Sequence, residues 1–494
     1  MKLKDLFTTL SIAPPADLDP KIELSSICND ARKVIAGSVF VAIKGVQLDG
    51  HTFIPSAIGN GATALVVEDK SHIPEIYQGH VLQVRDCREA LDLLACQFSN
   101  NPGDHLFAMG VTGTNGKTSV CYMAESILNA AEIPTGVVGT VNHHLLNRIW
   151  PSDMTTPDPI FLQARLREFL DAGAKAVAME VSSHALSQSR ANSVSFDTVV
   201  FTNLSRDHLD YHKTMEQYFE AKSKMFHDLI GRSTKKIKTA IINGDDEYGR
   251  KINVSPGVRR WTYGVDPDHD LSYEILSMEF AKTEFLVRTP EGEMKMSLPM
   301  SGEHNIMNAL AAVGVGLSAG VSLATCAKAL ESFTGVPGRL QTVPNNKKLS
   351  VFVDYAHTPD ALENVLSSLG KIRSSLKSPA RIWTVFGCGG DRDKGKRPMM
   401  AEVASKGSDF VIVTSDNPRS ENPHVIIEEI MSGFDSLENI KSIEDRKTAI
   451  EYAIHNAVPG DVILIAGKGH EDYQIVGQTK YPFSDVEVAA QSMN

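Results

Sequence analysis

The chain has 494 residues, of which 42% are hydrophobic and 22% are charged, and its formal net charge is −11 at pH 7. These proportions are typical of a soluble globular protein and exclude a disordered, collagen-like or coiled-coil chain. The length predicts roughly three domains. The acidic balance argues against a nucleic-acid-binding protein, although a local basic pocket can still bind an anionic ligand.

The cysteines and the apolar segments indicate where the protein resides. The six cysteines form no CxxC pair, which suits a reducing compartment. The apolar run at the N-terminus is short and ends at Pro14, so no signal peptide is expected. Residues 308–327 carry no charge but are rich in Ala, Gly and Ser, which favours two buried helices over a membrane span. We predict a cytoplasmic monomer without membrane insertion.

The first hundred residues predict a small α/β domain. Their apolar runs, which are typical of short strands, are residues 38–43 and 62–67. The turn-rich segment Ser99–Asp104 follows them and is a plausible domain boundary. We therefore predict a first domain over residues 1–103.

The rest of the chain alternates apolar strands with amphipathic helices, which predicts parallel sheets covered by helices on both faces. A second turn-rich segment, Gly335–Arg339, separates two such blocks. The predicted strands are residues 106–112, 174–181, 198–202 and 239–242 before it, and 349–353, 382–386, 410–414 and 462–466 after it. The predicted fold is three α/β domains: residues 1–103, a central doubly wound domain over 104–337, and a Rossmann-like domain over 338–494.

The strongest local motif is a phosphate loop, GTNGKT, between a predicted strand and a predicted helix over Thr118–Ala130. It differs from a strict Walker A motif because Val111 occupies the position of the first glycine. Glycines allow backbone N–H groups to approach phosphate, and the helix N-terminus adds positive potential. A Gly-rich turn is the alternative, but the position between strand and helix predicts nucleotide binding. The expected contacts are Gly113, Thr114, Asn115, Gly116, Lys117, Thr118 and Ser119, with Lys117 on the β/γ-phosphates and Thr118 on Mg²⁺.

Four further motifs follow in order along the chain: MEVSSH at 179–184, NLSRDHLDYH at 203–212, GEHN at 302–305 and DYAHTP at 354–359. Together with the phosphate loop they resemble the motifs of the ATP-dependent Mur ligases, over nearly the whole chain. The closest resemblance is to the members that add the third amino acid to the stem peptide of bacterial peptidoglycan. Such an enzyme would serve cell wall synthesis, cell shape and cell division.

The resemblance implies an amide ligation through an acyl phosphate. ATP would phosphorylate the glutamyl γ-carboxylate of a UDP-N-acetylmuramoyl (UDP-MurNAc) dipeptide, and an amine would then displace the phosphate. This chemistry needs neutralised phosphoryl charge and precise placement of both substrates. Closure of the domains would supply the placement.

The resemblance also implies two Mg²⁺ sites and a lysine carbamate formed with CO₂. Thr118 and Glu180 would bind one metal ion, and His208 the second. Lys222 would be the carbamylated lysine, N6-carboxylysine, because a carbamate offers the oxygen ligands that a hard cation prefers. From the sequence alone, His208 would be structural, and Lys222 and Lys224 would be two solvated helix lysines. Lys117, His208 and Lys222 are the predicted catalytic residues.

The predicted substrate contacts fall in three groups. Asn305, Arg339 and Asp354 would bind ATP, although Asn305 could instead cap a helix. The UDP-linked substrate would contact Thr155, Thr156, Ser182, Gln188 and Arg190. Asp30 and Gln47 are candidates for the uridine contacts, with surface-loop roles as the alternative. Here the sequence departs from the family pattern at Ala31, Val46, Leu48 and Met154.

The C-terminal block carries the motifs GGDRD, SDNPR and GKGHE, which resemble those of members that add meso-diaminopimelate. Arg419 offers a planar fork that can clamp the extra carboxylate of this amino acid, and Arg392 can bind an acid group as well. The ammonium groups would be oriented by polar side chains near the Gly467 backbone. A capping turn is the alternative reading of Asp-Asn-Pro. The predicted diaminopimelate contacts are Arg392, Asp416, Asn417, Pro418, Arg419, Gly467 and Glu471.

Three alternatives to this function remain open at this point. One is the lysine-adding ligase of the same type, which typically lacks the arginine of the DNPR motif. Another is folylpolyglutamate synthetase, which has no comparable N-terminal domain. A third is a non-catalytic nucleotide-binding or regulatory protein, against which intact Lys117, Glu180, His208 and Lys222 argue.

Overall fold

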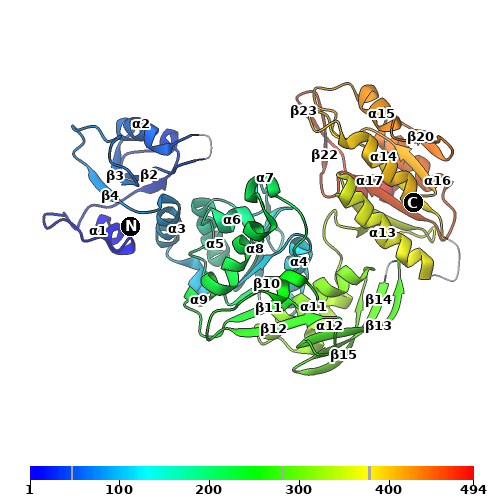
Figure 1. Ribbon diagram of the computed structural model, residues 1–494, viewed down its shortest axis with the longest axis horizontal. Helices are drawn as coiled ribbons and strands as arrows, with labels where there is room; N and C mark the ends of the chain where they lie inside the picture. Colours follow the sequence, from blue (N-terminus) through cyan, green and yellow to red (C-terminus); the bar gives the residue numbers. More distant parts are fainter. Residues whose placement is uncertain (46–47, 281, 376–379, 494) are drawn as a thin grey trace. The chain divides into compact units, whose positions relative to one another are not determined.

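The computed structural model describes residues 1–45, 48–280, 282–375 and 380–493 (Figure 1). Val46 and Gln47, including the predicted uridine contact, lie outside the described residues. The chain divides into two compact units, one formed by residues 1–272 with 310–326 and the other by residues 273–309 with 327–494. The predicted boundaries after residues 103 and 337 stay predictions.

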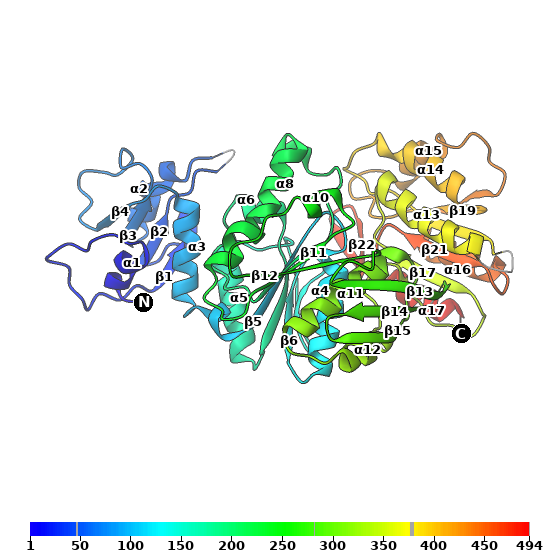
Figure 2. The same ribbon diagram turned by 60° about the horizontal axis from the view of Figure 1, so that its bottom comes forward.

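The first hundred residues of the first unit form a four-stranded parallel sheet with helices on both faces (Figures 1 and 2). Successive residues of a strand point to opposite faces. Val39 and Val41 accordingly pack toward α1 and α3, whereas Phe40 and Ala42 pack toward α2. The elements are α1 Leu3–Thr9, β1 Ser26–Cys28, β2 Ser38–Val41, α2 Ile54–Gly59, β3 Ala62–Val67, β4 His80–Gln83 and α3 Cys87–Phe98.

The central sheet of the first unit has the strand order β12-β11-β10-β5-β9-β6-β7-β8. It is parallel from β12 to β6, and β7 and β8 add an antiparallel edge. The strands are β5 Phe107–Thr112, β6 Thr135–Val138, β7 His143–Leu145, β8 Arg148–Trp150, β9 Ala176–Glu180, β10 Thr198–Phe201, β11 Thr239–Asn243 and β12 Arg259–Gly264. The helices are α4 Lys117–Ala130, α5 Pro159–Asp171, α6 Ser183–Ser187, α7 Leu209–His212, α8 Met215–Lys224, α9 Ile230–Arg232 and α10 Glu247–Arg250.

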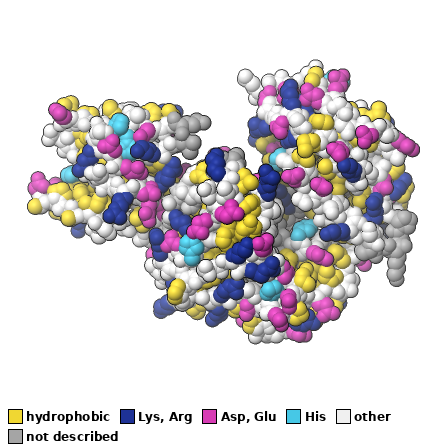
Figure 3. Space-filling view, in the orientation of Figure 1, with side chains coloured by type: hydrophobic (Ala, Val, Ile, Leu, Met, Phe, Trp, Pro, Cys, Tyr) yellow, Lys and Arg dark blue, Asp and Glu magenta, His cyan; other side chains and the backbone are white. Residues whose placement is uncertain are grey.

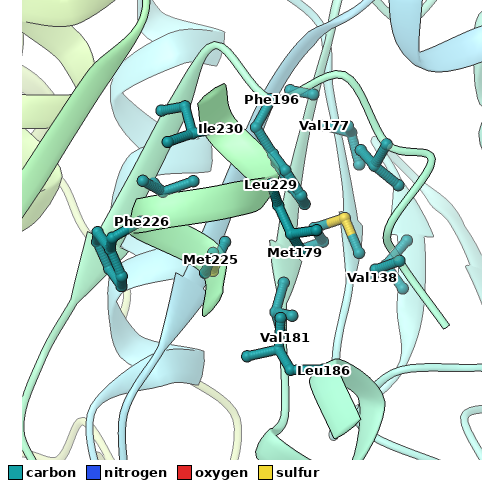
Figure 4. Packing of buried hydrophobic residues seen from close by; sticks show 14 of the residues in the cluster. Val138, Val177, Met179, Val181, Leu186, Phe196, Met225, Phe226, Leu229 and Ile230 are labelled. Atoms are coloured by element: carbon teal, nitrogen blue, oxygen red, sulfur yellow. The ribbon is translucent and has the colours of Figure 1, made fainter. Parts of the chain in front are cut away.

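One face of the central sheet is covered by a helical segment that continues from α8 through a π-helical turn, Met225–Leu229, into α9. Met225, Phe226 and Leu229 of this segment pack in one buried cluster with Met179 of β9 and Phe196 (Figure 4). Burial of a large apolar side chain stabilises the fold by about 1.5–3 kcal/mol. This packing fixes α8, which carries Lys222, against the sheet.

The second unit contains a six-stranded sheet of order β16-β17-β21-β18-β19-β20, parallel except for β16. Its strands also alternate: Phe352 and Leu464 pack toward α13–α15, and Val351 and Ile463 toward α16 and α17. The strands are β16 Gln341–Thr342, β17 Ser350–Asp354, β18 Ile382–Phe386, β19 Phe410–Val413, β20 Ile440–Ser442 and β21 Val462–Ala466. The helices are α13 Pro359–Ser375, α14 Lys396–Gly407, α15 Pro423–Met431, α16 Arg446–Asn456 and α17 Asp485–Met493.

Several antiparallel strands were not among the predicted elements. β14 Lys282–Thr289 pairs with β15 Gly292–Leu298, and β22 Tyr473–Val476 pairs with β23 Thr479–Pro482. β13, Leu271–Glu279, begins in the first unit and continues in the second. β14 and β15 carry charged residues on their exposed face, and β22 and β23 are partly or fully exposed. These strands therefore lack the continuous apolar runs of the buried parallel strands.

The uncharged segment 308–327 forms the helix pair predicted for it. Its first part lies in α11 Glu303–Ser318 and its last part in α12 Leu323–Glu331, with residues 319–322 connecting the two helices. Ala309 to Val313 are fully buried. No helix in the described part of the chain is both long and apolar enough to cross a membrane.

A buried ion pair ties α16 to α17. Arg446 and Asp485 are both fully buried or nearly so, and the guanidinium donates Nε and Nη2 to the two carboxylate oxygens at 2.7 Å each. Arg446→Met should leave the Asp485 charge buried and unpaired, which costs about 3–5 kcal/mol. We expect thermal unfolding of the second unit at a clearly lower temperature. The exposed pair Arg167–Asp171 is the control, since Arg167→Met should cost at most about 1 kcal/mol. Equal shifts in unfolding temperature for the two variants would contradict the stabilising role of the buried pair.

Candidate active site

The phosphate loop joins the carboxyl end of β5 to the N-terminus of α4. Gly113 has a φ of +149°, and a Cβ there would overlap Thr202 Oγ1. Gly116, with a φ of +87°, precedes the first residue of α4. Both glycines are therefore required by the backbone, and the helix N-terminus behind them is suited to bind an anion.

The residues after β10 hold the loop in place. Thr114 N donates to Asn203 O at 2.8 Å, and Asn115 N donates to Asn203 Oδ1 at 3.0 Å. Thr202 Oγ1 donates to Asn115 O at 2.6 Å. The loop is thus braced before any ligand arrives, which reduces the ordering cost of binding.

The strand order places this loop at a switch point of the sheet. β5 lies between β9 and β10, and the chain continues from β5 to β6 on the far side of β9. Ligands of doubly wound folds bind at the carboxyl ends of the strands at such a point. The Lys117 ammonium lies there, donating to Gly113 O at 3.1 Å and Thr114 O at 2.8 Å.

Glu180 ends β9 beside the first turn of α4 and is 1% exposed. Its Oε1 accepts from Thr118 Oγ1 at 3.0 Å and from Thr140 N at 2.8 Å, and its Oε2 accepts from Thr140 Oγ1 at 3.0 Å. A carboxylate and a hydroxyl side by side are oxygen donors of the kind that Mg²⁺ prefers. The predicted pair Thr118 and Glu180 is therefore brought together.

The prediction from sequence alone that Lys222 is a solvated lysine is wrong. Its side chain is 1% exposed, and Nζ donates to Gly113 O at 2.8 Å. Burial, together with the nearby charge of Lys117, holds the pKa of Lys222 well below its usual range. The cause of the burial is the packing of α8 against the sheet, which helix periodicity alone does not reveal. Lys224 is half buried and donates to Leu186 O at 3.5 Å.

His208 lies in the left-handed region, with a φ of +54°, immediately before α7. Its ring centroid is 4.9 Å from that of His184, and its Nε2 is 3.3 Å from Asp207 Oδ2. No group of three or more His, Cys, Asp or Glu residues in the described ranges is arranged to hold a metal ion. Thr118 and Glu180 offer the oxygen donors expected of the first predicted Mg²⁺ site. The second metal site, at His208, and the carbamate on Lys222 stay predictions.

The five residues predicted to contact the UDP-linked substrate outside the first domain form one polar network beside Glu180. Thr155 Oγ1 is 3.0 Å from Thr140 Oγ1, and Thr156 Oγ1 donates to Glu180 O at 2.9 Å. The Ser182 backbone N donates to Thr156 Oγ1 at 3.0 Å. The remaining two, Gln188 and Arg190, bond to each other, and Arg190 Nη1 donates to Thr156 O at 3.0 Å. Burial lowers the pKa of Arg190.

Asp30, the predicted uridine contact that can be described, is already engaged. It caps the 3₁₀ turn Ala31–Lys33 and forms an ion pair with Arg32, whose hydrogen bonds lower the pKa of Asp30 to about 2. Its role toward uridine stays a prediction.

The predicted ATP residues of the second unit lie near the end of β17. Asp354 ends the strand and accepts from Leu340 N at 2.6 Å and Ala356 N at 2.8 Å, while burial raises its pKa. The Arg339 guanidinium lies 5.6 Å from the centroid of the Tyr355 ring. Asn305 is 3% exposed and donates to Ser301 O at 2.8 Å. Their contact with ATP stays a prediction.

The two arginines predicted for diaminopimelate flank one glycine. A Cβ on Gly389 would lie 2.9 Å from Arg419 Nη1 and 3.8 Å from Arg392 Cγ. Arg419 is half buried, with a φ of +52°, and donates to Gly390 O at 2.9 Å. The Arg419 guanidinium and the side-chain stem of Arg392 thus lie beside the same glycine, and a guanidinium is suited to bind a carboxylate.

The acceptors predicted for the ammonium groups also converge. Asn417 Nδ2 donates to Glu471 Oε2 at 2.8 Å, and the backbone N of Asn417, which precedes Pro418, donates to Asp416 Oδ1 at 2.6 Å. Gly467 has a φ of +117°, and a Cβ there would lie 2.7 Å from Asp416 Oδ2.

Lys468 is a residue that the sequence analysis missed. Its ammonium is fully buried and donates to Asn417 Oδ1 at 2.9 Å and Tyr473 O at 2.8 Å, with Glu471 Oε2 at 3.5 Å. Burial lowers the pKa of Lys468. Its position inside GKGHE was the available signal, but a lysine between glycines normally predicts an exposed turn.

Lys468→Met should misplace Asn417 and Glu471 while keeping the apolar stem of the side chain. The loss of charged hydrogen bonds worth about 1.5–3 kcal/mol should raise KM for the amino acid at least about tenfold and leave KM for ATP nearly unchanged. Steady-state kinetics on protein verified as folded by circular dichroism measures both constants. Lys480→Met, at an exposed position, is the control; an unchanged amino-acid KM for Lys468→Met would contradict the role.

The fold and the site define an enzyme that binds a nucleoside triphosphate at a braced phosphate loop. Family models match in three segments: "Mur ligase family, catalytic domain" over residues 23–99, "Mur ligase middle domain" over 111–316 and "Mur ligase, glutamate ligase domain" over 338–469. The chain belongs to the Mur ligase family, whose members are ATP-dependent ligases, and it has the three-domain α/β fold predicted for it.

Full-length relatives give a finer comparison. The chain is 41% identical to the UDP-N-acetylmuramoyl-L-alanyl-D-glutamate--2,6-diaminopimelate ligase of Geobacter metallireducens, over 99% of this chain and 98% of the relative. It is also 41% identical to the protein of the same name from Bacillus velezensis, over 100% and 99%. A solved structure of a ligase of this name matches with a TM-score of 0.74 and 32% identity, covering 100% of this chain and 98% of that one.

The alternative function, that of a folylpolyglutamate synthetase, is supported by a similarity of fold alone. The folylpolyglutamate synthase of Thermotoga maritima matches with a TM-score of 0.59 at 18% identity and covers 76% of this chain and 89% of that one. Membership of the Mur ligases, confirmed over the full length, excludes this alternative and that of a non-catalytic protein of another family.

Proposed function

We propose that this chain joins meso-2,6-diaminopimelate to UDP-N-acetylmuramoyl-L-alanyl-D-glutamate, at the expense of ATP, in the synthesis of peptidoglycan precursors. The observation that carries the proposal is the pair Arg419 and Arg392 beside Gly389, within a chain whose full-length relatives bear the name of this activity. A second carboxylate distinguishes diaminopimelate from lysine, and a guanidinium pair is suited to bind it.

The reaction requires charge neutralisation around the transferred phosphoryl group. The backbone N–H groups of the phosphate loop and the Lys117 ammonium bind the phosphates of ATP. Thr118 and Glu180 would hold one Mg²⁺ ion and His208 a second, and these ions would supply further positive charge there when they are bound. Arg190 and Thr156 orient the UDP-linked substrate so that its γ-carboxylate meets the γ-phosphate of ATP.

Lys222 is suited to carbamylation because the reaction needs a neutral amine. Its amine would add to CO₂ with loss of one proton and give a carbamate anion. Burial holds the pKa of Lys222 well below its usual range, which favours the neutral amine over the ammonium. The carbamate would supply oxygen ligands to Mg²⁺.

The amino acid substrate is bound by the loops after β18, β19 and β21. Asp416, Asn417 and Glu471 accept from or orient its ammonium groups. The amine attacks the acyl phosphate, the new C–N bond forms, and inorganic phosphate leaves with the C–O bond electrons, while the nitrogen gives up one proton to solvent. Three properties stay predictions: the location in the cytoplasm, the monomeric state and the absence of a nucleic-acid partner. Figure 3 shows basic and acidic side chains interspersed on the face in view.

Release of inorganic phosphate tests the proposed function. We expect release only when ATP, Mg²⁺, UDP-MurNAc-L-Ala-D-Glu and meso-diaminopimelate are all present. Equal release with UDP-MurNAc-L-Ala in place of the dipeptide would identify another step of the pathway and contradict the proposal.

Arg419→Ala should remove much of the preference for diaminopimelate. The variant loses the fork that binds the far carboxylate, and each charged hydrogen bond is worth about 1.5–3 kcal/mol. We expect kcat/KM for meso-diaminopimelate to fall on the order of a hundredfold, with a much smaller change for L-lysine. Arg373→Ala, on the exposed end of α13, is the control. An equal loss with both amino acids would show that Arg419 only maintains the loop.

A further inference from the structure

A second cavity lies within the first unit, away from the phosphate loop. Its volume is about 540 Å³, and it is lined by α1, α3 and the segments 192–195 and 229–234. Asp104 and Ser195, which line it, precede β5 and β10, whereas the phosphate loop and Asn203 follow these strands. The cavity therefore lies at the opposite edge of the sheet and has the size of a small-molecule site.

The charge of the cavity wall is negative. Asp5, Glu89, Asp92 and Asp104 line it, against a single cationic side chain, Arg232. Arg232 is itself paired with Glu89, at 3.5 Å, and with Asp228. The wall thus carries more acidic than basic side chains, which favours a cationic ligand.

Asp92 is the most informative residue of this wall. It is fully buried, and its Oδ2 accepts from Ser193 Oγ, but its Oδ1 has no hydrogen-bond partner among the described residues. Burial raises the pKa of this carboxyl to about 7, with Glu89 and Lys224 as neighbouring charges. A buried polar atom without a partner costs about 1–3 kcal/mol, and an N–H group of a ligand would remove that cost.

We propose that this cavity is a binding site for a small aliphatic polyamine, whose ammonium groups bind Asp92 and the neighbouring carboxylates. Among the described residues, the acidic side chains of the wall do not form a group of three or more arranged to hold a metal ion. Thr8, Thr234 and Gln97 add hydroxyl and amide groups, and Leu93 and Val194 add apolar surface for a methylene chain.

The test is titration of the full-length protein with spermidine by isothermal calorimetry at constant ionic strength. We expect saturable binding by the wild type, weakened at least about tenfold in Asp92→Asn, which keeps the side-chain shape but removes the charge. Glu75→Gln, at an exposed position outside the cavity wall, is the matched control and should bind as the wild type does.

A second variant keeps the test decisive if Asp92→Asn fails to fold. Gln97→Lys, at a half-buried position of the wall, places an ammonium in the cavity and should also weaken spermidine binding at least about tenfold. Both variants should retain the wild-type rate of ligation, which verifies the fold. Absence of saturable binding by the wild type, or binding by Asp92→Asn and Gln97→Lys as tight as that of the wild type, would overturn the proposal.

Discussion

Replacement of Lys222 by alanine is expected to abolish nearly all ligation while leaving the fold intact. The side chain is buried against the phosphate loop, with Nζ 2.8 Å from Gly113 O, and its carbamate would complete the oxygen ligands of a metal ion. Loss of a group that stabilises charge in a transition state typically lowers kcat by about 10²–10³. Short carboxylates such as acetate should restore part of the activity, because they can occupy the space of the missing carbamate.

The matched control is Lys224→Ala, two residues along the same helix. Lys224 is half buried and donates to Leu186 O at 3.5 Å, away from the phosphate loop. This variant should therefore retain most of the activity and respond little to acetate. Phosphate release with and without acetate measures both effects. Full activity of Lys222→Ala without acetate would show that Lys222 is an ordinary lysine.

Replacement of Lys117 by alanine is expected to have a comparable effect for a different reason. Its ammonium lies at the N-terminus of α4 beside the loop carbonyls, where it can follow the charge that develops on the phosphoryl oxygens. We expect kcat to fall by at least about 10², without rescue by acetate and with an unchanged melting temperature. Lys70→Ala, on an exposed turn, is the control, and near-normal turnover of Lys117→Ala would refute the phosphate-loop assignment.

The parallel strands and the phosphate loop were predictable because their signals are local. The runs Ala62–Val67, Ile382–Phe386 and Val462–Ala466 coincide with β3, β18 and β21, since strands buried on both faces are continuously apolar. The loop was predictable because its glycines have φ angles that other residues rarely adopt.

The burial of Lys222 and Lys468 was not predictable from local sequence. Each lysine is buried by contacts distant along the chain: Lys222 meets Gly113, and Lys468 meets Asn417. Composition and periodicity place lysine on the surface, and only the family resemblance indicated Lys222. The strands β14 and β15 were missed for a related reason, because their exposed face carries charged residues that interrupt the apolar pattern.

The central claim is the choice of amino acid, and a competition assay tests it most directly. The wild-type protein would be incubated with ATP, Mg²⁺, UDP-MurNAc-L-Ala-D-Glu and equal concentrations of meso-diaminopimelate and L-lysine, and the products would be separated by mass. Lysine would leave Arg419 and Arg392 without their carboxylate, so we expect diaminopimelate product in excess by at least on the order of a hundredfold. Comparable amounts of the two products would contradict the account.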